Sequence, residues 1–411
     1  MSFFDHPLAD YTLLLAATLA LLGLGLAMVL SASSVESFAK GGSSFSQFEK
    51  QAMFAALGLP LMLWLSRRPV AFFYRIAPLA LAAAFLLLVI VLIPGIGINV
   101  NGQQNWIGLP GGFSLQPSEI GKLALILWCA RILTQRQDRL DDWKELTLPM
   151  LPVAMLMVFL VLMEGDVGTA LVFMPIIAMM LLIAGVPLRL FGVLGGFALA
   201  VIVFMSLTEG YRMQRFQTWL DPESDPTGAG WQIIHGQMAL ATGGWWGVGL
   251  GASREKWGAL PEAHNDFIFA IIGEELGLMG TLSVLGLFGL IGLVAVRIAR
   301  RTDELFVRLV TMGIVAWIVT QAVINIGAVI GALPITGVPL PLVSYGGSSL
   351  VLVLCALGVL LAFARQQPAA AALLRQRRVN SRRTKRRRNR ADSSAGANSA
   401  AGAGTAVVRR G

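Results

Sequence analysis

Residues 11–31 read YTLLLAATLALLGLGLAMVLS, 21 consecutive residues without a charged side chain. A helix of about 20 apolar residues is long enough to cross the roughly 30 Å hydrocarbon core of a bilayer. Similar runs, bounded by charge, Pro or Gly, recur along most of the chain. The predicted spans are residues 11–31, 49–66, 71–94, 118–134, 147–163, 168–185, 189–208, 267–297, 306–330 and 348–366. The sequence therefore predicts an all-α polytopic membrane protein with about ten transmembrane helices.

The overall composition supports this fold class. The chain has 411 residues, of which 56% are hydrophobic and only 13% are charged. Soluble proteins carry about 25% charged residues, so the composition excludes a soluble globular protein. The first apolar run lacks a basic segment before it and is too long for the core of a signal peptide, so we expect it to stay in the mature protein.

The net charge of +9 comes from the C-terminal end of the chain. From Arg365 onward there are 13 Lys or Arg residues and a single acid, Asp392. The sequence predicts a transmembrane domain over residues 1–366 and a disordered basic tail over residues 367–411. We expect the tail to be attracted to anionic lipid at about 1 kcal/mol per cation, with docking to an acidic cytoplasmic partner as the alternative.

The positions of the cations in the loops predict the orientation. Arg and Lys residues occur in alternate loops, and these loops share a side with the basic tail, so both termini are predicted to be cytoplasmic. The opposite loops, at residues 95–117, 209–266 and 331–347, are therefore predicted to be external. The longest, about residues 209–266, connects the seventh and eighth helices. Because long ordered loops often carry function, the external face is where we expect the site.

Several classes of site are disfavoured by what the sequence lacks. There is no nucleotide-binding Walker loop, no nucleophile-elbow motif and no zinc-type spacing among the three histidines. The two cysteines, Cys129 and Cys355, both lie in apolar runs, which predicts packing residues and no disulfide framework.

The first polar cluster spans the 95–117 loop and the apolar run after it. Residues 101–107 read NGQQNWI, residues 116–119 read QPSE, and Lys122 follows Glu119 by three positions. This spacing places Glu119 and Lys122 on one face of a helix. Two interpretations remain open: a self-neutralising pair that eases burial, or a lysine that faces an anionic group entering from outside.

The second cluster is a short external turn, EGDVGT, at residues 164–169. Asp166 either caps the helix that follows or takes part in substrate binding. The sequence supports both interpretations equally.

The third cluster, PEAHND at residues 261–266, ends the long loop. Asp266 directly precedes an apolar run, so the pattern alone predicts an N-cap. The same carboxylate would lie at the external membrane boundary beside His264 and within reach of Arg212 or Arg215, a suitable place for a general base.

Two further features lie near this cluster. Glu274 and Glu275 are adjacent in a predicted helix and must point about 100° apart, so both cannot face lipid. They predict a polar bundle interior or cavity, with helix–helix hydrogen bonding as the alternative. The stretch GGWWGVGLG at residues 243–251 lacks the context of a dinucleotide site. Its glycines predict close backbone approach, and its tryptophans suit the headgroup zone of a membrane.

Several strings together resemble the SEDS family of cell-wall polymerases, which includes FtsW, RodA and SpoVE. The matching strings are residues 101–107, 116–119 with Lys122, DVGT at 166–169, PEAHNDFIF at 261–269, GEELG at 273–277 and PLPLVSYGGSS at 339–349. They run in family order over roughly residues 10–365 and imply the SEDS fold.

Within the family, the sequence is most similar to the FtsW branch of actinobacterial type. Lys256 and Trp257 followed by the 261–266 cluster, and the long basic tail, carry this similarity. Two positions depart from the family pattern. Asn105 stands where many members have an arginine before Trp106, and Glu164 with Gly165 replaces a common Gln-Pro pair.

The resemblance implies a peptidoglycan glycosyltransferase, an inverting hexosyltransferase that polymerises lipid II into β-1,4 glycan strands during septal synthesis. Asp266 matches an acidic residue taken as essential, and Trp106 matches a tryptophan important for activity. We hypothesise that Asp266 deprotonates the GlcNAc 4-hydroxyl of an acceptor lipid II, which attacks C1 of the donor MurNAc. Lys122, Arg212 or Arg215 would stabilise the leaving pyrophosphate, a task that a divalent cation such as Mg or Mn could share.

The other substrate-binding candidates are Trp106, Glu119, Asp166, His264 and Ser344, with Glu274 and Glu275 as structural or cavity residues. A lipid II flippase, a RodA-type elongation polymerase and a non-catalytic scaffold for a transpeptidase remain alternatives. The implied partners are a class B penicillin-binding protein, the FtsQ-FtsL-FtsB regulators and, through the tail, FtsZ. The implied location is the division septum of the bacterial cytoplasmic membrane, with no nucleic-acid partner.

Overall fold

The computed structural model describes residues 6–39, 43–100, 103–110, 113–139, 143–193, 195–196, 217–258, 260–373 and 376. Nine of the ten predicted spans fall on helices in this part of the chain, while most of the span near residues 189–208 lies outside it. These helices are α1 (Ala9–Ala39), α2 (Ser46–Leu65), α3 (Val70–Val91), α4 (Pro117–Gln135), α5 (Trp143–Met163), α6 (Val167–Ile183), α10 (Ile268–Arg300), α11 (Leu305–Val329) and α12 (Gly347–Gln366).

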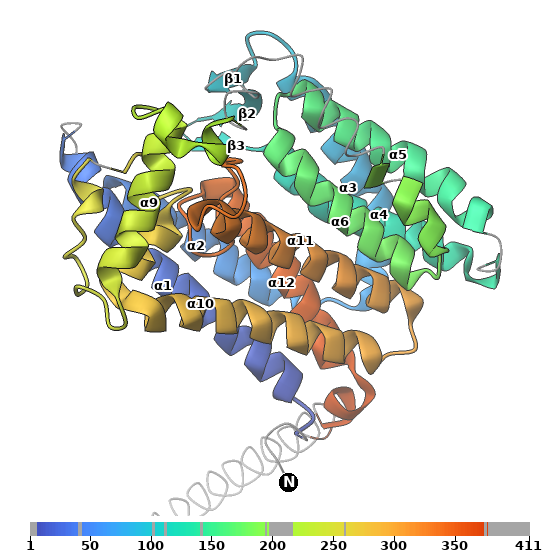
Figure 1. Cartoon of the computed structure of the whole chain (residues 1–411). Coiled ribbons are helices and arrows are strands. Elements are labelled where there is room, and N and C mark those ends of the chain that lie inside the picture. Colours follow the sequence, from blue (N-terminus) through green and yellow to red (C-terminus); the bar gives the residue numbers. More distant parts are fainter. Residues whose placement is uncertain are drawn as a thin grey trace, which may run out of the picture.

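The helices form a bundle in which segments distant in sequence lie side by side (Figure 1). Five of them, α1, α3, α10, α11 and α12, are long and apolar enough to cross a membrane, and residues 147–163 and 167–183 form shorter apolar helices. The predicted polytopic helical membrane fold is confirmed. Helix α2 packs against α12, α3 against α4, α1 against α10, and α6 against α11.

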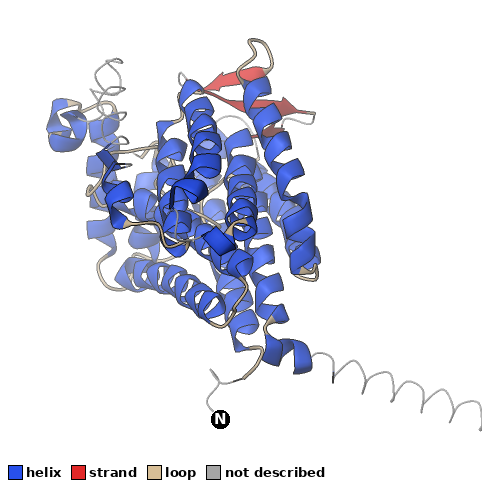
Figure 2. Ribbon diagram, turned by 90° about the vertical axis from the view of Figure 1, so that its right-hand side faces the viewer, coloured by secondary structure: helices blue, strands red, loops and turns tan. Residues whose placement is uncertain are grey.

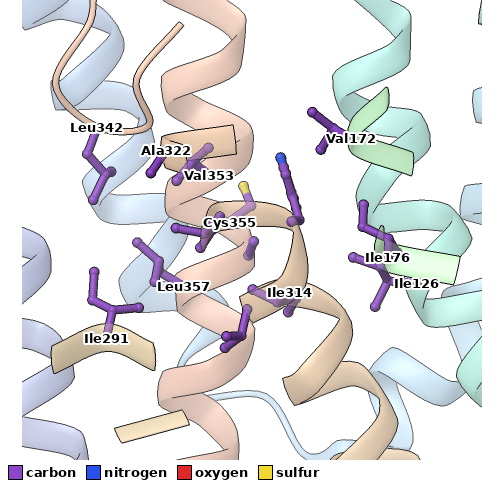
Figure 3. Packing of buried hydrophobic residues seen from close by; sticks show 14 of the residues in the cluster. Ile126, Val172, Ile176, Ile291, Ile314, Ala322, Leu342, Val353, Cys355 and Leu357 are labelled. Carbon is purple, nitrogen blue, oxygen red and sulfur yellow. The ribbon is translucent and has the colours of Figure 1, made fainter. Parts of the chain in front are cut away.

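The centre of the bundle is a continuous apolar core. Figure 3 shows Ile126 of α4, Ile176 of α6, Ile314 of α11 and Leu357 of α12 converging there. Both cysteines are buried and free, and Cys355 lies within this packing, as the sequence predicted.

A small β-sheet, which the sequence did not predict, forms in the 95–117 loop. The strands are β1 (Gly97–Val100), β2 (Gln103–Leu109) and β3 (Phe113–Leu115). They pair antiparallel in the order β1-β2-β3, with Ile98 opposite Trp106 and Ile107 opposite Leu115. Figure 2 shows the sheet at one end of the bundle. It fixes the loop directly above the start of α4.

The long loop contains a further helix, α9 (Ala229–Gly243), with the short 3-10 turns η3 (Pro222–Ser224) and η4 (Glu255–Trp257) on either side. Figure 1 shows α9 beside the first part of α10, and the two helices are in extensive contact. The remaining short turn, η2 (Gln137–Arg139), follows α4 at the opposite end of the bundle.

Helix α10 is broken at Gly277, whose φ of 67° and ψ of −164° are not helical. A break of this kind frees backbone groups that need new partners. The loop after α9 supplies them: Val248 N donates to the Glu274 carbonyl at 2.9 Å, and Leu278 N donates to the Gly244 carbonyl at 2.9 Å. The predicted close backbone approach of this glycine-rich stretch is therefore made against a helix.

We expect Gly277→Ala to destabilise the protein by at least about 2 kcal/mol, because it strains a glycine-only backbone conformation and overpacks the contact. A Cβ at Gly277 would meet the Trp245 carbonyl oxygen at 2.6 Å. Thermal unfolding of the detergent-solubilised protein measures the effect. Gly286→Ala in the same helix is the control, since a Cβ there meets nothing within 4 Å. Equal melting temperatures for the two variants would contradict the prediction.

At the end of the bundle away from the sheet, Asp10 joins three distant segments. The Asp10 side chain is 1% exposed and binds Arg297 Nε at 3.0 Å and Arg301 Nη1 at 2.9 Å. Gln367 Nε2, just after α12, donates to the same carboxylate at 3.3 Å. We call this group the Asp10 clasp. It ties α1 to the ends of α10 and α12.

Candidate functional site

A pocket of about 530 Å³ opens beside the small sheet, where the starts of α4, α6 and α12 come together. The 261–266 turn and the 335–347 segment complete its walls. Its lining residues are Lys50, Phe54, Ile98, Gln103, Asn105, Trp106, Phe113, Ser114, Gln116, Glu119, Asp166, Thr169, Gln232, Glu262, Asn265, Asp266, Ile335, Thr336, Gly337, Pro339, Tyr345, Gly346, Gly347 and Ser349. All three polar clusters of the sequence thus meet in one cavity, and we call the side of the bundle that carries it the pocket face.

The pocket is rich in carboxylic acids. Among the described lining residues, Glu119, Asp166, Glu262 and Asp266 are acidic, whereas Lys50 is the one cation. Lys50 lies on α2 and is exposed, and the sequence analysis did not select it. Nothing in the local sequence around Lys50 indicates a site, because α2 is brought to the pocket by packing against α12, which lies far along the chain.

Asp166 is both a helix cap and part of the pocket wall. Its Oδ1 accepts the Thr169 backbone N–H at 2.9 Å, which is the N-cap contact of α6 that the sequence proposed. Its Oδ2 accepts from Thr169 Oγ1 at 2.8 Å, from Asn105 Nδ2 at 3.1 Å and from Gln116 Nε2 at 2.9 Å. Asn105, at the position of the missing arginine, thereby joins the sheet to α6. This network makes the carboxylate a rigid part of the wall.

Glu119 and Lys122 form a buried ion pair. Lys122 Nζ lies 2.6 Å from Glu119 Oε1 and 3.1 Å from Gln321 Oε1, and it sits 5.0 Å from the centre of the Trp317 ring. Both residues are 1% exposed. Glu119 lines the pocket and Lys122 lies one turn deeper, outside the lining. The arrangement matches the self-neutralising interpretation of the i,i+3 spacing.

Asp266 lines the pocket and is partly exposed. It lies on a turn whose backbone is held by three hydrogen bonds. The carbonyl oxygens of His264, Asn265 and Asp266 accept from Tyr345 N at 3.0 Å, Ser344 Oγ at 2.7 Å and Asn325 Nδ2 at 2.9 Å. The three donors come from the 339–347 segment and from α11. The backbone that carries Asp266 is therefore fixed independently of its carboxylate.

The N-cap interpretation of Asp266 is wrong. Helix α10 begins at Ile268, its N-cap is Phe267, and no side chain caps it. The cause is a turn that the pattern does not reveal: Glu262 has a φ of 54°, and its carbonyl accepts from Asn265 N at 3.0 Å and Phe267 N at 3.3 Å. This turn directs Asp266 to the pocket.

His264 and Ser344 lie behind the lining. His264 is buried, and its ring meets the Tyr345 ring edge to face at 5.6 Å between centroids. Ser344 Oγ also accepts from Leu340 N at 2.8 Å. Trp106, in contrast, lines the pocket from β2 and is partly buried. The structure thus brings Trp106, Glu119, Asp166 and Asp266 to the cavity and leaves Lys122, His264 and Ser344 one layer behind it.

Glu274 and Glu275 do not line the pocket. The Glu274 carboxylate accepts from Arg254 N at 2.8 Å, and Glu275 Oε1 lies 3.1 Å from Lys256 Nζ and accepts from Ser31 Oγ at 2.6 Å. The two acids anchor the loop after α9 to α10 and α1. The contact with Ser31 is a helix–helix hydrogen bond, which was the alternative interpretation, whereas the loop contacts were not predicted.

Arg212 and Arg215 lie outside the described residues, so the structure places neither of them. Among the described residues, no group of three or more His, Cys, Asp or Glu side chains is arranged to hold a metal ion. The involvement of a divalent cation at this pocket therefore stays a prediction made from the sequence.

Glu164 is a buried acid beside the pocket that the mechanism does not use. It is 1% exposed, and neither carboxylate oxygen has a hydrogen-bond partner among the described residues. Burial first, and then the charge of Asp166, raises the pKa of the Glu164 carboxyl to about 9. It is therefore neutral at pH 7, which suits a position where the family commonly has glutamine.

We expect Glu164→Gln to remove a pH-dependent loss of stability. A folded-state pKa of about 9, above the ordinary 4.5, means that the native protein retains a proton that the unfolded chain loses. The wild type should therefore lose stability as the pH rises from about 4.5 to 9. Melting temperatures at pH 5, 7 and 9 measure this, and the advantage of Glu164→Gln should grow with pH. An advantage that is constant over this range would contradict the prediction.

The sequence model of the FtsW/RodA/SpoVE family, described as cell cycle protein, matches residues 12–368. Curated relatives cover most of the chain. The probable peptidoglycan glycosyltransferase FtsW of Mycobacterium tuberculosis is 42% identical over 365 residues, which is 88% of this chain and 69% of the relative. Stage V sporulation protein E of Bacillus subtilis is 40% identical over 353 residues, covering 86% of this chain and 96% of the relative.

Solved structures agree with the sequence comparison. A chain from a study of how a peptidoglycan synthase complex coordinates polymerization and crosslinking superposes with a TM-score of 0.70 at 30% identity, over 86% of this chain and 97% of that chain. The rod shape determining protein RodA of Thermus thermophilus superposes with a TM-score of 0.64 at 28% identity, over 86% of this chain and 96% of that chain.

Proposed function

The chain belongs to the FtsW/RodA/SpoVE family, and we propose that its pocket polymerises lipid II with Asp266 as the general base. It is a multi-pass membrane protein and a peptidoglycan glycosyltransferase of FtsW type. The geometry of the pocket supports the choice of Asp266 and the roles assigned to the residues around it.

The exposure of Asp266 carries this proposal. Among the four acids of the pocket, Asp166 and Glu119 are 5% and 1% exposed, and both are bound to neighbouring protein groups. Glu262 is exposed as well, but its carbonyl oxygen accepts from Asn265 N and Phe267 N of its own turn. Asp266 is partly exposed on a turn whose three carbonyl groups are held in place. A base must reach the hydroxyl from which it takes a proton, and a fixed backbone keeps it there.

The reaction then proceeds as a single displacement. Asp266 accepts the proton of the GlcNAc 4-hydroxyl of the acceptor, and this oxygen attacks C1 of the donor MurNAc. The bond from C1 to the pyrophosphate oxygen breaks, undecaprenyl pyrophosphate leaves, and the product linkage is β-1,4 with inversion at C1. Asp266 releases the proton to water before the next cycle.

The rest of the pocket provides binding groups. We assign Trp106 to stacking on a sugar ring and Asp166 to holding the wall in place through Thr169, Asn105 and Gln116. Lys50 is the described lining cation that faces the pocket, and we assign it to the pyrophosphate together with Arg212 or Arg215. Lys122 acts through Glu119, whose carboxylate it holds at the pocket wall. His264 and Ser344 position the Asp266 turn from behind.

The proposed setting is the bacterial cytoplasmic membrane at the division septum, with both termini cytoplasmic and the pocket face external. We propose a class B penicillin-binding protein as the partner, supported by the likeness to a chain from a peptidoglycan synthase complex. The FtsQ-FtsL-FtsB regulators and FtsZ are further proposed partners. Residues 1–366 would form the transmembrane domain, in agreement with the end of α12 at Gln366, and residues 367–411 the tail.

Gel-resolved polymerisation of labelled lipid II by the purified full-length protein, alone and with its class B penicillin-binding protein, tests the proposal. Glycan strands that require this chain support it. Absence of strands even with the partner, combined with movement of lipid II across liposome bilayers, would replace the polymerase by a flippase.

A further inference from the structure

The loop after α9 presents an exposed aromatic and aliphatic surface away from the pocket. Trp245 is 64% exposed, Trp246 79%, Leu250 68% and Trp257 72%. Residues 236–252 contain no charged side chain. We call Trp245, Trp246, Leu250 and Trp257 the tryptophan tip. An exposed apolar surface of this extent on one short segment indicates that lipid or another molecule covers it.

The position of the tip along α10 is fixed by backbone contacts. Leu278 N donates to the Gly244 carbonyl at 2.9 Å, and Met279 N donates to the Trp245 carbonyl at 3.4 Å. The buried pair of Lys256 and Glu275, 3.1 Å apart, anchors the far end of the same loop. The position of the tip relative to α10 is therefore fixed. Its depth in the membrane follows from the depth of residues 275–279.

The sequence of α10 shows where the hydrocarbon boundary falls. No charged residue occurs between Glu275 and Arg297. At 1.5 Å per residue, the roughly 20 residues from Gly277 to Arg297 span about 30 Å, the thickness of the hydrocarbon core. This reasoning places the boundary on the pocket face near Gly277, at the level of the tip, about ten residues after the start of the 267–297 span predicted from the sequence. Directly below it, Leu278, Met279, Leu282 and Leu285 are exposed, a surface that suits acyl chains.

We infer that the tryptophan tip is inserted into the lipid leaflet of the pocket face, with its indole rings at the boundary between headgroups and acyl chains. Tryptophan is enriched at this level of membrane proteins because its ring is apolar and its N–H is polar. The exposed surface of the tip continues into the lipid-facing side chains of α10, which favours lipid over a protein partner. The loop that ends at Asp266 is thereby held at a set depth in the membrane. This inference holds whether or not the proposed base is correct.

Spin labels in the full-length protein, reconstituted into phosphatidylcholine and phosphatidylglycerol liposomes, test this placement. Cys129 and Cys355 are replaced by alanine, and a nitroxide is attached at Trp246→Cys, Leu250→Cys or, as a control, Ser224→Cys. Ser224 lies in η3 and is exposed, and it belongs to a polar part of the loop. Collision rates with oxygen, which enters lipid, and with a water-soluble nickel chelate report the environment of each label.

We expect labels at positions 246 and 250 to collide mainly with oxygen, and the label at position 224 to collide mainly with the nickel chelate. Nickel access at 246 and 250 equal to that at 224 would place the tip in water and overturn the inference. Protection from both reagents would also overturn it, since a protein partner or a second copy would then cover the tip.

A second measurement leaves the cysteines unchanged. Dibrominated phosphatidylcholine quenches indole fluorescence on contact, and the chain has 10 tryptophans. The double variant Trp245→Phe and Trp246→Phe keeps an aromatic, apolar side chain at both exposed positions, so it should fold and lose part of the quenchable fluorescence. A quenchable fraction that is unchanged from wild type would overturn the inference.

Discussion

Replacing Asp266 by alanine should lower the rate of lipid II polymerisation by about 10²- to 10⁴-fold, the usual range for loss of a general base. The loss should appear in kcat, because the acceptor hydroxyl would still bind but could not be deprotonated. The fold should be retained, since Asn325 binds the backbone oxygen of Asp266, and no side-chain cap of α10 is lost. Gel-resolved polymerisation with labelled lipid II measures the rate.

Two further variants test whether the loss of activity is due to the missing carboxylate of Asp266. Asp266→Asn keeps the size of the side chain and removes the base, so it should be as inactive as alanine. Glu262→Gln removes the neighbouring acid of the same turn, which also lines the pocket, and should retain most of the activity. A folded Asp266→Ala protein that polymerises lipid II at the normal rate would disprove the assignment, and inactivity of Glu262→Gln alone would transfer the role to Glu262.

Replacing Lys122 by methionine should destabilise the protein by about 3–5 kcal/mol, the cost of leaving one partner of a buried ion pair without the other. Glu119 would remain as a carboxylate that is 1% exposed, and Gln321 would lose its ammonium partner. Thermal unfolding in detergent measures the change. Methionine preserves much of the apolar length of lysine, so the loss of charge dominates the effect.

The double variant of Lys122→Met and Glu119→Gln separates stability from catalysis. Removing both charges should recover most of the lost stability, because the unpaired carboxylate is gone. If the double variant is stable but inactive, the pair serves the substrate as well as the fold. A Lys122→Met protein as stable as wild type would contradict the description of the pair as buried and mutually dependent.

The features that depend on short stretches of sequence, above all the positions of the helices, could be predicted from the sequence. Apolar runs placed the helices, because membrane thickness fixes their length, and the Asp166 cap was one of the two interpretations that its position before an apolar run allowed. Asp266 was selected as a candidate base, yet its local structure was predicted wrongly. The positive φ of Glu262 has no signal in the local pattern, and the turn that follows it is held by Tyr345, Ser344 and α11, which lie far along the chain.

The parts that were missed depend on tertiary packing. Lys50 reaches the pocket because α2 packs against α12, and no short-range signal reports that contact. The break at Gly277 and the binding of Glu274 and Glu275 to a loop depend on the path of residues 244–257. The three strands, of which β2 carries Trp106, are short, and they carry no alternating pattern of their own.

The Asp10 clasp has a consequence for the order in which the chain is made. Asp10 leaves the ribosome first, but its partner Arg301 follows 291 residues later. At the usual 5–20 residues per second, α1 waits about 15 to 60 s with a carboxylate that has not met its arginines. A nascent chain that stops before Arg297 lacks both arginines, so its Asp10 carboxylate has neither ion-pair partner of the clasp.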